Sequence, residues 1–539
     1  MDRVEGSDLW ETSISAPSRA GQLWYDFTIR LTDGRTVRYG NADDQLGGIG
    51  KRVDAGPLAS YLLTVYDPDY RTPAWMHGAN IYQIFPDRFR KAPTASVDPR
   101  TDRPMHASWN EPMLYEKDSP DGSYNALDCF GGTIDGIREE LPYLRDLGIT
   151  VLYLNPVFEA RSDHRYDTGD YMKVDPLLGT NEELISLFRE AKALGIHVML
   201  DGVFSHTGAD SRYFDQLGHY GGTGAARSES SPYYSWYTFK RYPDSYRCWW
   251  GFPSLPECNK ADPSYRDFMF HDKTGVVPYW IAQGSSGWRL DVADELSLDF
   301  LRQLRVAAKK QDPEAVVLGE VWEDASNKEA YGEIRCYCCG DTLDSVMNYP
   351  LRQAVMDFAS RRSTAHELAR VIRHQQEVYP TPFLYSLMDL LGSHDRARAL
   401  NVLVGRDGQG LERRQQARIH LTRYEYRQAA ERYLLCLDIL CALPGWPTVY
   451  YGDEAGMTGC TDPFCRGTYP WGHEDTRLRE EVRRRLTARR SSDLLRYGTC
   501  LVEAVDDDTL RVTRALDGHA DALGQPTSIK EEKVFTFTR

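Results

Sequence analysis

The chain has 539 residues and a formal net charge of −15 at pH 7, and 41% of its residues are apolar and 12% aromatic. This length allows several domains with sizeable cores, and the acidic balance argues against a nucleic-acid partner. The sequence has no run of 18 apolar residues and no signal-peptide pattern at its start, so we expect no membrane partner and a cytoplasmic location.

The cysteine pattern favours reduced thiols. The chain has eleven cysteines, an odd number. Cys336, Cys338 and Cys339 crowd into one segment, but no histidines stand beside them at zinc-site spacing. We therefore predict that the thiols are free, as is usual in cytoplasmic proteins.

Residues 1–72 are predicted to form a small N-terminal β-module. Residues 24–31 alternate between apolar and polar side chains, residues 32–35 form a turn signal, and residues 36–39 resume a strand. Residues 61–66 read as a further strand. An immunoglobulin-like or carbohydrate-binding shape fits this pattern.

Strands alternate with amphipathic helices between residues 73 and 495. The predicted strands are 80–85, 150–154, 196–204, 288–292, 316–321, 383–390 and 448–451. The predicted helices are 133–147, 181–194, 298–310, 364–378 and 436–443. Such alternation indicates parallel βαβ units, and the count fits an α/β fold of the (β/α)8 barrel type.

Two segments depart from this alternation. Residues 205–262 lack regular units and are predicted to form an inserted domain B after the third strand, so that the barrel comprises residues 73–204 and 263–495. Residues 496–539 contain two predicted strands, 500–504 and 509–513. They are too short for a full β-sandwich, so we expect a short C-terminal β-module.

Charged residues mark one buried strand of the predicted barrel. Arg289 and Asp291 lie at i and i+2 in residues 288–292, so they project from the same face. A buried charge needs a partner or a use. Arg289 can hold Asp291 ionised and fixed in direction, which suits a carboxylate nucleophile. A structural ion pair is the alternative interpretation.

Other acids stand at the ends of later strands. Glu320 follows the strand 316–321 among apolar neighbours, and Asp395 lies beside His394 after the strand 383–390. Functional groups gather at the carboxyl ends of barrel strands, so Asp291, Glu320 and Asp395 are expected to meet. Retaining glycoside hydrolysis requires a carboxylate nucleophile and a carboxylic acid close together, and this pattern supplies both.

Four short blocks now carry a resemblance: DGVFSH, GWRLDVADE, GEVWED and LLGSHD. In order and spacing they resemble the four signature regions of the α-amylase superfamily of glycoside hydrolases. The stretches IYQIFPDRF, LNPVFEA, HRYDTGDY and MNYP are most similar to the neopullulanase, cyclomaltodextrinase and maltogenic amylase group. So are NADDQLGGIG and TVYDPDYRTPAW at the end of the first module.

The resemblance implies roles for individual residues. Asp291 corresponds to the nucleophile, Glu320 to the general acid/base and Asp395 to the transition-state stabiliser. The residues implied to bind substrate are His164, Tyr166, His206, Arg289, Trp322, His394, Asp462 and Arg466. Among these, Tyr166 is implied to stack on the sugar before the scissile bond and Trp322 to line the acceptor side.

Three departures from the group affect what the resemblance implies. Residues 255–259 read LPECN where the group has MPKLN, which bears on fine specificity. Ser205 stands where an asparagine often binds calcium, and RKAPTASVDPR (90–100) replaces the usual calcium loop. We therefore expect no structural calcium at those positions and no cofactor. The N-terminal module is shorter than the group's dimer-forming domain, so both a monomer and a homodimer stay open.

The predicted function is a retaining α-glucan hydrolase acting on maltodextrin, cyclodextrin or pullulan. It cleaves α-1,4 bonds, and cleavage of α-1,6 bonds is left open. An α-glucan transglycosylase with the same site is the alternative among enzymes. A non-catalytic carbohydrate-binding relative is the alternative of another class, and the presence of all three carboxylates argues against it.

Overall fold

The computed structural model describes residues 1–94, 96, 103–116 and 126–539. Its centre is an eight-stranded parallel sheet in the order β19-β16-β15-β12-β9-β8-β21-β20. The strands are β8 (Ile81–Ile84), β9 (Val151–Leu154), β12 (His197–Gly202), β15 (Gly287–Leu290), β16 (Val316–Gly319), β19 (Ser345–Val346), β20 (Met388–Leu390) and β21 (Trp446–Tyr450). A parallel bridge between Met347 and Met388 joins the two ends of the sheet. The predicted (β/α)8 barrel is therefore confirmed.

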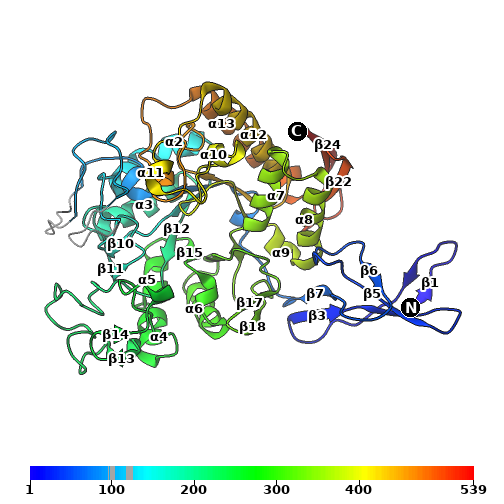
Figure 1. Cartoon of the computed structure of the whole chain (residues 1–539), viewed down its shortest axis with the longest axis horizontal. Coiled ribbons are helices and arrows are strands. Elements are labelled where there is room, and N and C mark those ends of the chain that lie inside the picture. The colour runs from blue at the N-terminus through cyan, green and yellow to red at the C-terminus, as the bar shows by residue number, and fades with distance from the viewer. Residues whose placement is uncertain (95, 97–102, 117–125) are drawn as a thin grey trace.

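Helices surround this barrel in Figure 1. They are α1 (Ile134–Glu139), α2 (Leu141–Asp146), α3 (Asn181–Ala193), α4 (Pro263–Phe270), α5 (Val276–Ala282), α6 (Leu298–Gln311), α7 (Tyr349–Ala359), α8 (Ala365–Val378), α9 (Thr381–Leu384), α10 (Ala399–Leu403), α11 (Arg413–Gln416), α12 (Arg423–Ala442), α13 (Thr476–Arg490) and α14 (Asp493–Tyr497). Capping boxes begin four of them, with Glu412 as the N-cap of α11 and Thr180, Thr364 and Thr422 as the N-caps of α3, α8 and α12. Each threonine accepts a backbone N–H that the first turn leaves unpaired.

Some predicted elements differ from the observed ones. The predicted helix 133–147 is two helices, because Pro142 near the start of α2 cannot continue the α1 ladder. The first part of the predicted strand 383–390 is helix α9, and only β20 is strand. The predicted helix 436–443 is the end of the longer α12. Strand β19 has two residues and was not predicted.

The segment 205–262 holds a small hairpin, β13 (Phe239–Arg241) and β14 (Ser245–Tyr246), and two short 3-10 helices, η3 (Tyr234–Trp236) and η4 (Trp249–Gly251). Its core consists of rings, with Phe214 stacked on Phe239 and edge-on to Tyr246. Two further hairpins extend from the barrel. They are β10 (Phe158–Ala160) with β11 (Thr168–Val174), and β17 (Lys328–Ala330) with β18 (Glu333–Arg335).

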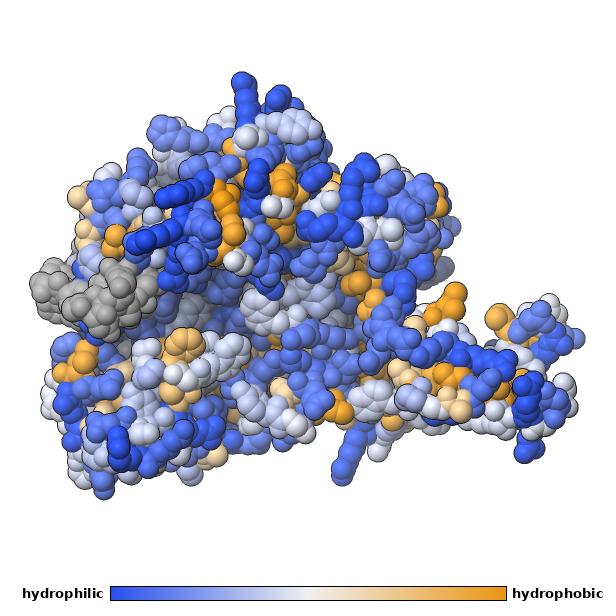
Figure 2. Space-filling view, in the orientation of Figure 1, coloured by the Kyte–Doolittle hydropathy of each residue, from blue (hydrophilic) through white to orange (hydrophobic). Residues whose placement is uncertain are grey.

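The N-terminal module extends away from the barrel, at the right of Figure 1. Its strands are β1 (Asp2–Arg3), β2 (Trp10–Glu11), β3 (Gly21–Tyr25), β4 (Phe27–Arg30), β5 (Thr36–Gly40), β6 (Lys51–Val53) and β7 (Tyr61–Val65). The predicted single strand 24–31 breaks at Asp26, because β3 pairs with β7 whereas β4 pairs with β5. The module's strands form three small sheets, β1-β2, β3-β7 and β4-β5-β6. Figure 2 shows apolar residues on the surface of this extension. Leu9, Ile14 and Ile49 of this module are exposed.

The C-terminal strands β22 (Thr499–Asp506), β23 (Thr509–Asp517) and β24 (Lys530–Thr538) form one antiparallel sheet, so a third strand joins the two predicted ones.

The prediction of free thiols is wrong for Cys336 and Cys339, which form a disulfide. Their C-x-x-C spacing lets a tight turn bring the Cα atoms to 5.8 Å, within bonding range. The other nine cysteines are free. In the described ranges, no helix has the length and apolar character needed to span a membrane.

Candidate active site

The carboxyl ends of neighbouring barrel strands bring charged side chains together. Asp201 in β12 pairs in register with Arg289 in β15, and Asp291 and Glu320 follow the last residues of β15 and β16. Because parallel strands end at the same edge of a barrel, these side chains share one mouth. The expectation that Asp291 and Glu320 meet there is supported by a shared partner, Arg289.

Arg289 is fully buried and lies at the centre of the charged group. Its Nη1 lies 2.8 Å from Asp201 Oδ1 and 3.1 Å from Asp291 Oδ1, and its Nη2 lies 2.9 Å from Glu320 Oε2. A planar guanidinium can bond several carboxylates in fixed directions, which an ammonium cannot. Arg289 therefore does more than form the isolated ion pair with Asp291 that the sequence left open.

Both oxygens of the Glu320 carboxyl group accept hydrogen bonds. The Trp322 indole N–H donates to Oε1 at 2.9 Å, and the Val292 backbone N–H donates to Oε2 at 2.8 Å. Val292 adopts a left-handed conformation with φ 41°, which is costly for a β-branched residue. This turn directly after Asp291 aims the next amide at Glu320, so the strained backbone links the two carboxyl groups.

Asp395 completes the group of acids. Its Oδ2 lies 3.2 Å from His394 Nε2, and its Oδ1 lies 3.8 Å from Arg466 Nη2. Burial, together with the Glu320 carboxylate, raises the pKa of Asp395 to about 7, although Arg466 and Arg289 lower it. The carboxyl group therefore lies in a site where its charge is poorly compensated.

The electrostatics of Asp291 correct one expectation. Arg289 lowers the pKa of Asp291, as predicted, but burial and the carboxylates of Glu320, Asp201 and Asp395 raise that pKa well above its ordinary value. Asp201, Asp291 and Glu320 share the one Arg289 guanidinium, so the negative charges around Asp291 are only partly balanced.

A hydrogen-bond network beside the acids fixes His394 in one neutral form. Burial lowers the pKa of His394 well below its ordinary value, and Arg466 and Arg289 lower it further. Gln83 Nε2 lies 2.9 Å from His394 Nδ1 and can only donate, so Nδ1 is the acceptor. The remaining proton lies on Nε2, 2.7 Å from the Tyr166 hydroxyl.

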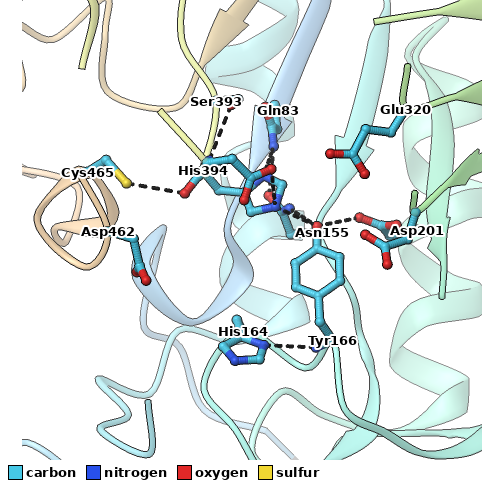
Figure 3. Close-up of polar contacts among 12 residues, drawn as sticks. Gln83, Asn155, His164, Tyr166, Asp201, Glu320, Ser393, His394, Asp462 and Cys465 are labelled. Carbon is cyan, nitrogen blue, oxygen red and sulfur yellow. Dashed lines mark hydrogen bonds and ion pairs between the residues drawn. The ribbon is translucent and has the colours of Figure 1, made fainter. Parts of the chain in front are cut away.

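Tyr166 ties this network to the acids. Its hydroxyl donates to Asp201 Oδ2 at 2.8 Å and accepts from Asn155 Nδ2 at 2.9 Å, and its ring faces the His394 ring at 5.2 Å. Figure 3 shows Asp201, Tyr166 and His394 turned toward one another. The sequence reading did not select Asp201, Asn155 or Gln83 as site residues. The sequence pattern that could have identified these three residues is a polar side chain at the carboxyl end of an apolar strand.

The two other histidines are also neutral. Burial lowers the pKa of both His164 and His206 to about 3. His206 Nε2 lies 3.0 Å from the Tyr166 carbonyl and must donate to it, so Nδ1 accepts from the Ser205 hydroxyl at 2.8 Å. His164 Nδ1 accepts the Tyr166 backbone N–H at 3.0 Å. Both rings thus position Tyr166.

Asp462, Arg466 and Trp322 lie at the edges of this mouth. Arg466 pairs with Asp462 at 2.9 Å, and its Nε donates to the His394 carbonyl at 3.0 Å. Trp322 stacks on Tyr349 at 4.2 Å, and the Arg396 guanidinium lies 4.3 Å from the Trp322 ring centre. The structure thus places every predicted site residue around one mouth. The sequence reading missed Tyr349 and Arg396.

Comparisons with known proteins agree with this geometry. Residues 83–500 match the model of the alpha-amylase catalytic domain. Over 96% of its length the chain is 36% identical to an amylopullulanase from Thermoanaerobacterium saccharolyticum, of which it covers 42%. Over 96% it is also 33% identical to a cyclomaltodextrinase from Geobacillus thermopakistaniensis, of which it covers 79%. The chain thus spans less than half the length of the amylopullulanases that it matches.

A solved structure is similar as well. The cyclic α-maltosyl-(1→6)-maltose hydrolase from Arthrobacter globiformis, in complex with cyclic α-maltosyl-(1→6)-maltose, aligns with a TM-score of 0.68. The two chains are 31% identical, and the alignment covers 83% of this chain and 90% of that one.

Proposed function

Because the chain belongs to the α-amylase family, we propose that it is a retaining α-glucan hydrolase whose reaction takes place at Asp291, Glu320 and Asp395. It cleaves α-1,4 glucosidic bonds in maltodextrin, cyclodextrin or pullulan, and the product analysis described below decides whether it also cleaves α-1,6 bonds. The observation that carries this assignment is the buried Arg289 guanidinium, which forms ion pairs with both Asp291 and Glu320 at the carboxyl edge of the barrel.

The first step forms a glycosyl-enzyme. An Asp291 carboxylate oxygen attacks C1 of the sugar before the scissile bond, and the bond from C1 to the glycosidic oxygen breaks. The protonated Glu320 carboxyl gives its proton to that oxygen, which leaves as the hydroxyl of the departing sugar.

The second step releases the sugar. Glu320, now ionised, takes a proton from water, whose oxygen attacks C1 and displaces Asp291. The enzyme regains its starting protonation, and the configuration at C1 is retained after two inversions. A sugar hydroxyl in place of water gives transglycosylation at the same site.

Other residues bind and orient the sugar. Neutral His394 and His206 hold Tyr166 in place without adding positive charge near the departing proton. Asp395 lies in a poorly compensated site, where a carboxylate stabilises the positive charge that develops on the sugar in the transition state. His164, Tyr166, Asp462 and Arg466 line the donor side, and Trp322 lines the acceptor side.

The test separates chemistry from binding. Glu320→Gln keeps the shape of the side chain and removes the acid, so it is expected to abolish turnover of maltodextrin while maltoheptaose still binds. Asp291→Asn is expected to be equally inactive, and only proteins with Asp291 intact should form a covalent glycosyl adduct detectable by mass spectrometry. Retained activity in Glu320→Gln would refute the assignment.

Product analysis defines the bond that is cleaved. Panose, isopanose and maltotriose from pullulan each report a different scission, and the ratio of hydrolysis to transfer at low and high maltose separates a hydrolase from a transglycosylase. Binding without any turnover would instead indicate a carbohydrate-binding protein.

Two further parts of the function complete the assignment. A cytoplasmic site of action is supported by the nine free cysteines, and fractionation of cells tests it. Both a monomer and a homodimer are compatible with an N-terminal module that extends from the barrel. Sedimentation measurements on the purified chain distinguish them.

A further inference from the structure

Two exposed rings meet on one carboxylate outside the catalytic mouth. Trp250 is 72% exposed and Tyr331 is 71% exposed. The Trp250 indole N–H donates to Glu295 Oε1 at 3.2 Å, and the Tyr331 hydroxyl donates to the same oxygen at 2.5 Å. Trp250 belongs to the segment inserted after β12 and Tyr331 to the β17–β18 turn, so Glu295 joins two separate parts of the chain.

Both rings occupy backbone positions that disfavour them. Trp250 has φ 46° and Tyr331 has φ 54°, and each is followed by a left-handed glycine, Gly251 or Gly332. Tyr331 and Gly332 form a two-residue hairpin loop between β17 and β18. Such loops with two positive φ values favour Asn-Gly or Asp-Gly, because asparagine and aspartate tolerate this conformation. Asparagine would suit this backbone conformation better than tyrosine does, so the loop geometry alone does not explain an exposed tyrosine here.

Trp249 and Trp250 lie next to His206, one of the residues at the barrel mouth. His206 lies 5.3 Å from Trp249, and Trp249 stacks on Trp250 at 5.0 Å with an angle of 12° between the planes. Figure 1 shows the hairpins β13–β14 and β17–β18 along the lower edge of the view, with α6 between them. The face of Trp250 turned away from Trp249 and the exposed Tyr331 ring can each take the apolar face of a sugar unit, while their polar tips stay hydrogen-bonded to Glu295.

We propose that Trp249, Trp250 and Tyr331 form an outer binding site for α-glucan chains, which holds glucose units that extend beyond the catalytic pocket. Glu295 fixes the directions of the Trp250 and Tyr331 rings. This inference rests on the proposed function and adds a preference for long chains. Sugar fits these rings better than a protein partner does, because the row of rings is continuous with His206.

The test uses substitutions that favour the backbone and remove the rings. In the full chain carrying Glu320→Gln, Tyr331→Asn and Trp250→Asn are each expected to weaken maltoheptaose binding by about ten-fold and to leave maltotriose binding unchanged. In the active enzyme the same substitutions should lower kcat/KM for maltoheptaose and not for maltotriose. Their melting temperatures should equal or exceed that of the parent, because asparagine suits a left-handed position.

Two controls make the outcome decisive. Tyr331→Phe keeps the ring and loses the bond to Glu295, so it should have an intermediate effect. Tyr424→Ala removes a ring of similar exposure on α12, far along the chain from this site, and should change neither ligand. Unchanged maltoheptaose binding in both asparagine variants overturns the outer site, and so does a change of oligomeric state as their only effect. A parent that turns over neither oligosaccharide contradicts the proposed function instead.

Discussion

The Arg289 guanidinium lies 2.9 Å from the Glu320 carboxylate, although the two residues come from different strands of the barrel. The same side chain reaches Asp291 and Asp201 with its other terminal nitrogen. One arginine thus sets the relative positions of the residues assigned as nucleophile and acid. The structure of the site depends on a planar cation more than on any direct contact between the acids.

Arg289→Lys is therefore expected to be far from conservative. A lysine keeps the charge but cannot bond these carboxylates in fixed directions. We expect turnover of maltodextrin to fall at least about 100-fold, and the free energy of unfolding to fall by about 3 kcal/mol, because buried carboxylates lose their partner. Arg302→Lys, at an exposed ion pair with Asp341, is the control and should alter neither quantity. Near-normal kcat in Arg289→Lys would contradict the central role of the guanidinium.

Much of this arrangement could be predicted because it follows from local patterns. Apolar strands with charges at their ends specify a barrel mouth, and the i, i+2 spacing of Arg289 and Asp291 puts both on one face. Gln83 and Asn155 could not be selected, since each is one polar residue whose partners lie on other strands. The burial that raises the pKa of Asp291 is likewise a property of the assembled site.

The elements of the fold likewise divide into those that local sequence patterns predict and those that depend on the assembled structure. Long periodic helices such as α6 and α8 begin and end close to their predicted bounds. Strand β19 has two residues and no readable period, and the start of β20 was obscured by the apolar helix α9, which precedes it. The Cys336–Cys339 bond depends on a turn geometry that composition does not reveal.

The indole of Trp322 is expected to act on turnover through Glu320. Trp322→Phe keeps a ring against Tyr349 and removes the N–H that donates to Glu320 Oε1. A hydrogen bond to a charged group contributes about 1.5–3 kcal/mol, so kcat should fall about ten-fold or more. KM for short maltodextrins and the melting temperature should stay close to those of the parent. Trp322→Ala also loses the packing and should destabilise the protein; equal kcat in Trp322→Phe and the parent would show that the indole bond has no role.

Chelation is expected to leave the protein's stability unchanged. The Ser205 hydroxyl donates to His206 Nδ1, and a single neutral hydroxyl oxygen contributes little to a calcium site. The loop 90–100 is the other usual position in the family, and positions 95 and 97–100 of that loop lie outside the described residues. Excess EDTA should not shift the melting temperature, measured by calorimetry. A fall of more than about 5 °C that added Ca²⁺ reverses would instead establish a structural calcium site.

Asp395 is expected to make the protein less stable as the pH rises. Its folded pKa of about 7 exceeds the ordinary value of 3.8, so between these values the native state holds a proton that the unfolded chain has lost. The free energy of unfolding therefore falls as the pH rises through this window. Asp395→Asn removes the charge, and relative to the parent it should raise the free energy of unfolding at pH 8 by up to about 4 kcal/mol more than at pH 4. Urea denaturation of both proteins at the two pH values measures this difference.

The same variant should be catalytically inactive. The Asp395 charge that lowers the stability of the folded protein is the charge that we assign to stabilising the positive sugar in the transition state. A variant that is equally or more destabilised at pH 8 than at pH 4 would mean that Asp395 is well compensated in the folded protein.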